Sequence, residues 1–177
     1  MKIFSKSNGY AVCKDSLVYL KKLEDNSIDL IITSPPFALT REKAYGNKKG
    51  EEYMDWLKEF GEVFYQKLKP EGSLVIDFGG SWTPGTPTRN LHQFKIPILF
   101  CEELNFHLAQ EFFWWNTSKM PTPASWVTIA RKRVTDSVNY IFWFSKTPNP
   151  KANNKNILKP YSKKMEQMIK NQTYNMK

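Results

Sequence analysis

The chain has 177 residues, 41% of them hydrophobic and 15% aromatic, which suffices to bury a core in one globular domain and excludes an intrinsically disordered protein. No run approaches the roughly 18 apolar residues that cross a bilayer, and Met1–Tyr10 lacks the apolar core of a signal peptide. We therefore expect a cytoplasmic protein with no membrane partner. Cys13 and Cys101 stand far apart without a CxxC or histidine companion, so neither a disulfide scaffold nor a metal site is expected.

The net charge of +9 is concentrated near the C-terminus. From Ser145 onward the chain carries eight lysines and one glutamate, a net +7, which leaves +2 for the preceding residues. Lysines near phosphates release condensed counterions, so this tail favours a polyanionic partner such as DNA. A solvated terminus has the same appearance, and charge alone leaves both interpretations open.

Predicted strands and helices alternate through the first half of the chain. Helical spacing of apolar residues indicates the helices, and uninterrupted apolar runs indicate buried strands. The predicted elements are a strand at Tyr10–Cys13, a helix at Leu17–Leu23, a strand at Ile28–Ile32, a polar loop at Thr40–Gly50, and a helix of about 16 residues at Tyr53–Leu68. Pro70 closes this last helix, because proline cannot continue it.

The second half is richer in strands. It is predicted to hold a turn at Lys69–Gly72, a buried strand at Ser73–Phe78, a loop through Pro87, a helix near Pro97–Leu104, and aromatic strands at Leu108–Trp115 and Val138–Ser145. This order indicates an α/β fold with a mostly parallel, helix-covered sheet. Ligands collect at the carboxyl ends of strands in such sheets, where four polar residues lie: Asp15, Ser34, Asp77 and Asn116.

The most informative stretch is Thr33-Ser34-Pro35-Pro36-Phe37, directly after the strand at Ile28–Ile32. Two prolines fix two φ angles and remove two N–H donors, so the carbonyls of Ser34 and Pro35 become rigid acceptors. An exocyclic amino group fits such acceptors, and Phe37 can stack on the ring that carries the amine. An arbitrary Pro-Pro pair is more often a plain strand terminator, but the flanking serine and aromatic residue favour the amine site.

With these residues the sequence resembles the amino-group DNA methyltransferases, whose motif reads Ser-Pro-Pro-(Phe/Tyr) in typical cytosine-N4 enzymes. The resemblance covers essentially the whole chain and is strongest for the N-terminal half of the PvuII-type cytosine-N4 enzymes. These belong to the permuted β group, in which the catalytic motif precedes the main cofactor motif. Further landmarks follow in the same order: Lys14–Leu17, Tyr45–Asn47, Leu68–Gly72, Asp77–Gly80, Trp115–Pro121 and Trp143–Thr147.

The resemblance implies roles for individual residues, with S-adenosylmethionine as cofactor and no metal. The catalytic residues are Ser34, Pro35, Pro36, Phe37 and Asp77, of which Asp77 helps to remove the amine proton. The cofactor contacts are Asp15, Ser16, Thr33 and Ser34. The flipped base lies against Phe37, Trp115 and Asn116. Positive charge makes six further residues candidates for DNA contacts: Arg41, Lys43, Lys119, Arg131, Lys132 and Arg133.

Plainer interpretations of some of these residues stay open. Asp77 can cap a turn, and Asp15 can cap the helix that follows it. Lys14 also stands where the family often has glycine, which weakens the case for a cofactor contact at Asp15. Strand aromatics are more often core, and we expect Trp114 to be buried while Trp115 faces the pocket.

The glycine-rich cofactor motif of the family is missing from this sequence. Phe78-Gly79-Gly80-Ser81 looks similar, but it follows the wrong strand, and we interpret it as a decoy. The implied fold is a Rossmann-like class I methyltransferase sheet, ordered 3-2-1-4-5-7-6, that lacks strands one and two and leaves the third without a neighbour. We expect residues 1–147 to form the catalytic part, residues 148–177 a basic tail leading toward the target-recognition region, and a second polypeptide or missing C-terminal half to fill the gap.

The sequence therefore predicts the catalytic half of a site-specific DNA methyltransferase in a restriction-modification system. It would methylate N4 of a flipped cytosine in double-stranded DNA and be inactive without its second segment. N6 methylation of adenine stays open, because both bases present an exocyclic amine. A noncatalytic DNA-binding remnant also stays open, whereas carbon-5 chemistry is disfavoured because neither cysteine follows a proline.

Overall fold

The computed structural model describes residues 2–6, 8–36, 48, 50–118, 120 and 123–171. Four predicted site residues fall outside these ranges, namely Phe37, Arg41, Lys43 and Lys119, as does most of the predicted loop at Thr40–Gly50. Among the described residues, no helix combines the length and apolar character that crossing a membrane requires.

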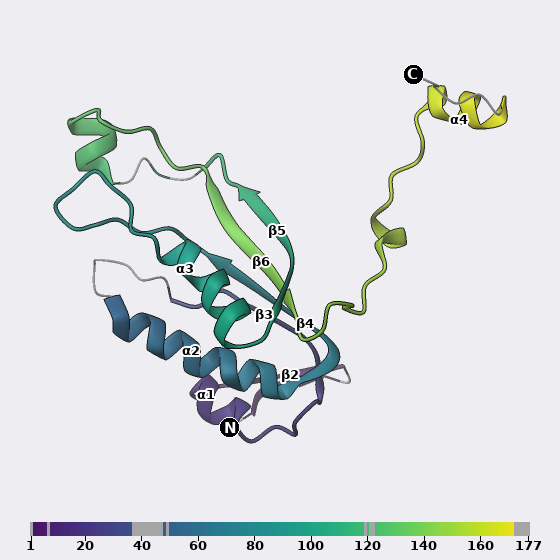
Figure 1. Ribbon diagram of the computed structural model, residues 1–177, viewed down its shortest axis with the longest axis horizontal. Helices are drawn as coiled ribbons and strands as arrows, with labels where there is room; N and C mark the ends of the chain where they lie inside the picture. The colour runs from purple at the N-terminus through teal and green to yellow at the C-terminus, as the bar shows by residue number, and fades with distance from the viewer. Residues whose placement is uncertain are drawn as a thin grey trace.

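A four-stranded mixed sheet forms the centre of the α/β fold (Figure 1). Its strands run in the order β3 (Ile28–Thr33), β4 (Leu68–Phe78), β6 (Val138–Ser145) and β5 (His107–Trp115). β3 and β4 are parallel, whereas β6 is antiparallel to both β4 and β5. Among the described strands, β3, β4 and β5 therefore run in the same direction, as expected of a mostly parallel sheet, and β6 runs opposite to them because it pairs directly with β5 without a crossover helix.

Helices cover one face of this sheet. Figure 1 shows α2 (Gly50–Lys67) and α3 (His92–Ile98) in front of the strands, and the π-helical turn η1 (Leu99–Glu103) continues α3. Their apolar side chains and every second residue of β4 and β6 form the core, which includes Leu57, Phe64, Ile96, Phe100, Leu74, Ile76, Phe78, Phe142 and Phe144. This is the period-2 pattern expected of a strand with one buried face.

The N-terminal segment forms a unit of its own beside the sheet. β1 (Lys2–Lys6) and β2 (Gly9–Val12) pair as an antiparallel hairpin, and α1 (Ser16–Leu20) follows. The strand predicted at Tyr10–Cys13 is therefore present within a residue of its expected place. It is the first strand of the chain after β1 and stands for the third strand of the implied family order, and the expectation that this strand has no neighbour is wrong. Hairpin pairing with β1 supplies its backbone hydrogen bonds locally.

Two boundaries differ from the prediction. β4 begins at Leu68, immediately after α2, so the expected turn at Lys69–Gly72 lies inside this strand. The pairing with β3 is irregular there: Ile28 pairs with Leu68, but Leu30 pairs with Ser73. The helix expected to begin at Pro97 begins at His92 instead, so that Pro97 lies in its last turn and not in its first. Pro97 lacks an N–H group, which removes one intrahelical hydrogen bond near the point where the π-helical turn begins.

After β6 the chain leaves the sheet. Figure 1 shows the segment running away from the body through the short helix η3 (Asn154–Ile157) to α4 (Lys163–Lys170). The Ser162 hydroxyl caps α4 by accepting a hydrogen bond from the Met165 N–H at 3.3 Å. Neither helix buries a residue, so this lysine-rich segment is exposed as far as the structure describes it.

Candidate active site

The parallel pair β3–β4 brings two predicted catalytic residues together. Thr33 lies opposite Ile76 in the register, so the next residues along the two strands, Ser34 and Asp77, are neighbours. The Ser34 hydroxyl donates a hydrogen bond to Asp77 Oδ2 at 3.4 Å. A hydroxyl and a carboxylate thus meet at the carboxyl end of the sheet, where ligands bind in open α/β folds.

A large groove opens beside this pair, between the β2–α1 unit on one side and β3 and α2 on the other. Its volume is about 1210 Å³. Six of the predicted site residues line it: Asp15, Ser16, Thr33, Ser34, Pro35 and Pro36. Ser34 is exposed, and Pro35 and Pro36 are half-buried. We call Ser34–Pro36 the proline corner. It faces open space, as an amine-binding site requires.

Asp15 stands at the N-terminus of α1. Its side chain accepts a hydrogen bond from the Val18 N–H at 2.9 Å, so it is an N-cap, as the plainer interpretation held. The residue is exposed and lines the groove, which leaves its second carboxylate oxygen accessible to a ligand. The Tyr10 and Tyr19 hydroxyls, 2.8 Å apart, hold α1 against β2 and so fix this wall of the groove.

The opposite wall comes from α2, which sequence reasoning did not assign to the site. Glu52, Tyr53, Trp56 and Phe60 line the groove. The Tyr53 ring centroid lies 5.8 Å from that of Trp56 and 6.0 Å from that of His92, and burial raises the pKa of the Tyr53 hydroxyl. The spacing of these aromatics in the sequence predicts the helix, but it does not indicate that the helix also lines a groove.

Trp115 and Asn116 lie at the same edge of the sheet but farther along it. They lie at the end of β5, which runs parallel to β4 but is separated from it by β6. Neither Trp115 nor Asn116 lines the groove. The Asn116 N–H donates to the Ser137 carbonyl at 2.7 Å, and its side chain accepts from the Ser118 N–H at 3.0 Å. Trp115 is 69% exposed; Trp114 is 51% exposed, so the expectation that Trp114 belongs to the core is wrong.

The three predicted DNA-contact residues at 131–133 differ in their surroundings. Arg131 and Lys132 are exposed, whereas the Arg133 guanidinium carbon lies 3.6 Å from the Trp82 ring centroid. Arg133 also donates to the Pro87 carbonyl at 3.0 Å and lies 3.7 Å from the Asp136 carboxylate. These contacts join the loop after β4 to the loop before β6, and they occupy a side chain that was expected to meet phosphates.

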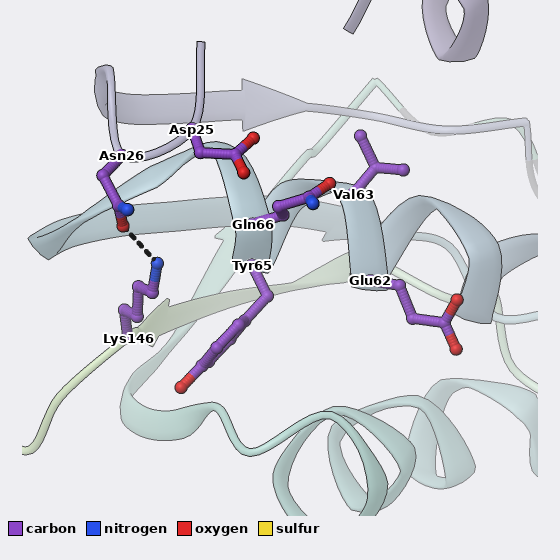
Figure 2. A pocket seen from close by; sticks show the side chains of 7 residues that line it. All are labelled: Asp25, Asn26, Glu62, Val63, Tyr65, Gln66 and Lys146. Carbon is purple, nitrogen blue, oxygen red and sulfur yellow. Dashed lines mark hydrogen bonds between the residues drawn. The ribbon is translucent and has the colours of Figure 1, made fainter. Parts of the chain in front are cut away.

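A second hollow, of about 520 Å³, lies at the other end of the sheet (Figure 2). Figure 2 shows Lys146 reaching from the end of β6 toward Asn26 in the turn before β3. The Lys146 ammonium donates to Asn26 Oδ1 at 2.7 Å and to the Leu68 carbonyl at 2.9 Å, and it lies over the Tyr65 ring. Burial lowers the pKa of Lys146, and we interpret this hollow as a structural joint between β6, α2 and the turn before β3.

The family is settled by a comparison with known protein families. Residues 28–177 match the N6/N4 methyltransferase family, described as DNA methylase. The chain belongs to this DNA methylase family. Its amino-group motif, Ser34-Pro35-Pro36, and the neighbouring Asp77 lie within the matched residues.

The curated relatives that this chain resembles are named Type II methyltransferases. M.PvuII of Proteus hauseri is 46% identical over 166 residues, which cover 94% of this chain and 49% of that enzyme. M.HpaI of Haemophilus parainfluenzae is 40% identical over 72 residues, which cover 38% of this chain and 22% of that enzyme. The chain thus spans about half the length of M.PvuII and a smaller share of M.HpaI.

Solved structures show the same fold. The PvuII DNA methyltransferase, titled cytosine-N4-specific, superimposes with a TM-score of 0.74 at 38% identity, covering 91% of this chain and 62% of that one. A putative DNA modification methylase of Thermus thermophilus, solved in complex with S-adenosyl-L-methionine, gives a TM-score of 0.54 at 20% identity, covering 86% of this chain and 56% of that one. The second likeness concerns the fold alone.

Proposed function

We propose that this chain is the catalytic half of an S-adenosylmethionine-dependent DNA methyltransferase that methylates N4 of a flipped cytosine, in a restriction-modification system. The observation that carries the proposal is the hydrogen bond between Ser34 and Asp77 beside an open proline corner. The 46% identity to M.PvuII, whose solved counterpart is titled cytosine-N4-specific, supports cytosine as the base.

The residues of this chain would hold and orient the amine. Because the Ser34 hydroxyl donates a hydrogen bond to Asp77, its oxygen lone pairs are left to accept one N–H of the base. The Pro35 carbonyl would accept the other N–H, and this pair of acceptors directs the nitrogen lone pair away from the ring. Asp77 Oδ2 would take the proton that the amine loses, directly or through Ser34.

The groove has the size and lining that an adenosine-containing cofactor requires, with aromatic rings at Tyr53 and Trp56 and carboxylates at Asp15 and Glu52. S-adenosylmethionine, when bound, would supply the methyl group on its sulfonium. Asp15, Ser16, Thr33 and Ser34 are the residues that would hold it. Since the glycine-rich motif is absent from the sequence, we propose that a second segment completes the cofactor site and that this chain alone is inactive.

Reconstitution tests the proposal. The chain is mixed with the half of Proteus hauseri M.PvuII that it does not match, then incubated with double-stranded DNA and cofactor, and the digested nucleosides are analysed by mass spectrometry. N4-methylcytosine is expected. N6-methyladenine would establish the alternative base, whereas no methylated nucleoside, together with DNA binding that Ser34→Ala leaves unchanged, would favour a noncatalytic DNA-binding remnant.

A further inference from the structure

The loop after β4 forms a hairpin close to Asp77. Trp82 and Arg89 pair as an antiparallel bridge, and the Thr83 N–H donates to the Thr88 carbonyl at 3.0 Å. Trp82 and Arg89 thus lie opposite each other, with the Arg89 guanidinium carbon 5.6 Å from the Trp82 ring centroid. Four residues separate Asp77 from Trp82, so a shift of this hairpin would reach the catalytic carboxylate.

Gly80 gives the Arg89 guanidinium room to lie against the backbone. A Cβ atom at position 80 would lie 2.6 Å from Arg89 Cζ and would overlap Arg89 Nη2. The φ angle of Gly80 lies outside the left-handed region, so glycine is needed here for space and not for backbone conformation. The Gly79-Gly80 pair, which looks like a cofactor motif in the sequence, therefore has a packing partner within this loop.

Asp136 joins Arg89 to the loop before β6. Its Oδ1 atom lies 3.6 Å from Arg89 Nη1 and 3.7 Å from Arg133 Nη2, and all three side chains are at most 23% exposed. Arg89 Nε is buried and makes no hydrogen bond among the described residues, so the ion pair with Asp136 and the contact with Trp82 hold this guanidinium. Salt screens such a partly buried pair much less than a surface pair.

The residue after Asp136 holds the predicted base pocket. Ser137 accepts the Asn116 N–H at 2.7 Å. The ladder between β4 and β6 ends one residue after Asp77, whereas the pairing of β5 with β6 continues farther. Beyond that point, the Arg89–Asp136 ion pair joins the segment after Asp77 to the segment that holds Asn116.

We infer that Arg89 is a positioning residue for methyl transfer. With Asp136, it holds the Asp77 carboxylate at a fixed spacing from the wall of the base pocket at Asn116. The inference rests on the proposed function. The spacing matters because a misplacement of about 1 Å in an active site can lower a rate by about 10²-fold. Arg133 contacts the same hairpin, but Arg89 lies against the backbone three residues after Asp77.

Hydrogen exchange in the single chain measures the link without DNA or cofactor. Arg89→Ala should speed exchange of the Asn116 amide at least about fivefold, because the segment that accepts its hydrogen bond loses an anchor. Asp136→Asn, which keeps the shape of the side chain but removes its charge, should have a similar effect. The amide of Ile76, in the buried part of β4, is the internal reference and should exchange at an unchanged rate.

A double-mutant cycle isolates the contact at Gly80. Gly80→Ala should lower the unfolding midpoint when Arg89 is present. In the Arg89→Ala background the same change should have no further effect, because the three atoms nearest to the added methyl group all belong to Arg89. Equal effects of Gly80→Ala in both backgrounds would show that Arg89 is not packed against this segment, and would overturn the inference.

Activity is measured in the enzyme reconstituted with the unmatched half of Proteus hauseri M.PvuII. Arg89→Ala should lower the single-turnover methylation rate at least about tenfold. The dissociation constant for DNA should change by less than about threefold, because the guanidinium is paired with Asp136 and not with phosphate. Arg89→Lys should restore part of the rate, since it keeps the charge but not the planar fork. Lys95→Ala removes an exposed charge from α3 and is the matched control, with an unchanged rate.

The outcomes separate this inference from the proposed function. An Asn116 amide that exchanges as in the wild type, or a full methylation rate for both Arg89→Ala and Asp136→Asn, would overturn the inference and leave the proposed function standing. A role in stability alone would lower the unfolding midpoint without changing the rate at temperatures where the variants are folded. If the wild-type complex methylates no DNA, the proposed function fails, whereas faster exchange at Asn116 in Arg89→Ala still supports the link between the two segments.

Discussion

The Ser34 hydroxyl lies 3.4 Å from the Asp77 carboxylate, although the two residues are 43 positions apart in the chain. The parallel pairing of β3 and β4 produces this proximity, because it aligns the carboxyl ends of the two strands. Ser34 is exposed and Asp77 is half-buried, so the pair sits at the boundary between the sheet and the groove. Its chemistry can be tested by removing either group.

Asp77→Asn should lower the turnover number of the reconstituted enzyme by about 10²-fold or more, because an amide cannot take up the amine proton. Ser34→Ala should have an effect of similar size, since it removes an acceptor for the base. Single-turnover methylation assays measure both. Asp55→Asn, at an exposed position on α2, is the matched control and should keep full activity. Normal turnover by Asp77→Asn would contradict the assigned role.

Cofactor binding should require both halves. Isothermal titration calorimetry of the single chain with S-adenosylmethionine is expected to give weak or no heat, because the glycine-rich motif is absent from the sequence. Addition of the second half should produce binding. A micromolar dissociation constant for the single chain alone would show that the groove needs no complement.

Asp15→Asn separates the two roles of that residue in the completed enzyme. Asparagine is as good an N-cap as aspartate, so the free energy of unfolding should change by less than about 0.5 kcal/mol. Cofactor affinity should nevertheless fall, because the negative charge in the groove is lost. Urea unfolding and calorimetry measure the two quantities. Equal affinity of the variant and the wild type would leave Asp15 with a capping role only.

Arg133 and Lys132 should affect DNA binding differently. Lys132 is exposed, so Lys132→Ala should remove one phosphate contact. The slope of log affinity against log salt concentration should then become shallower by about one. Arg133→Ala should leave that slope unchanged and lower thermal stability instead, because Arg133 packs on Trp82 and binds the Pro87 carbonyl. Fluorescence anisotropy of labelled DNA at several salt concentrations measures the slope, and tryptophan emission during heating measures the thermal stability. A reduced slope for Arg133→Ala would make it a phosphate contact.

The irregularity in β4 should depend on Gly72. A Cβ atom at this position would lie 2.9 Å from the Lys69 carbonyl oxygen and 3.1 Å from the Ile28 carbonyl oxygen. Gly72→Ala should therefore destabilise the fold by about 1 to 3 kcal/mol, measured by urea unfolding. Gly9→Ala is the control, because nothing lies within 4 Å of its added methyl group. Equal stability of the two variants would contradict the close packing at Gly72.

The sequence predicted the strands at β3, β5 and β6 closely, because each is a long apolar or aromatic run with clear ends. It also singled out Ser34 and Asp77, although their contact depends on a pairing between strands that no local pattern reveals. The partner of β2 was missed for the same reason, since β1 is a mostly polar segment without a strand-like alternation. Pairing between strands is a property of the folded chain and has only a weak local signal.

Side chains with two plausible environments were the hardest to assign. Arg133 stands in a basic triplet, which suggests phosphate binding, but its ring partner Trp82 is far away in the sequence. Tyr53 and Trp56 carry the spacing of a core helix and also line the groove. Periodicity identifies the apolar face of a helix, but it does not indicate whether that face meets a sheet or a cavity.

β3, α2 and β4 form one β-α-β unit, and this unit together with the residue that follows β3 holds both Ser34 and Asp77. A division of the gene downstream of β4 would therefore keep Ser34 and Asp77 on the same polypeptide. If the proposed second segment is a separate polypeptide, the amount of active complex follows the law of mass action. The level of the scarcer polypeptide, and not the total amount of protein, would then determine the rate of methylation.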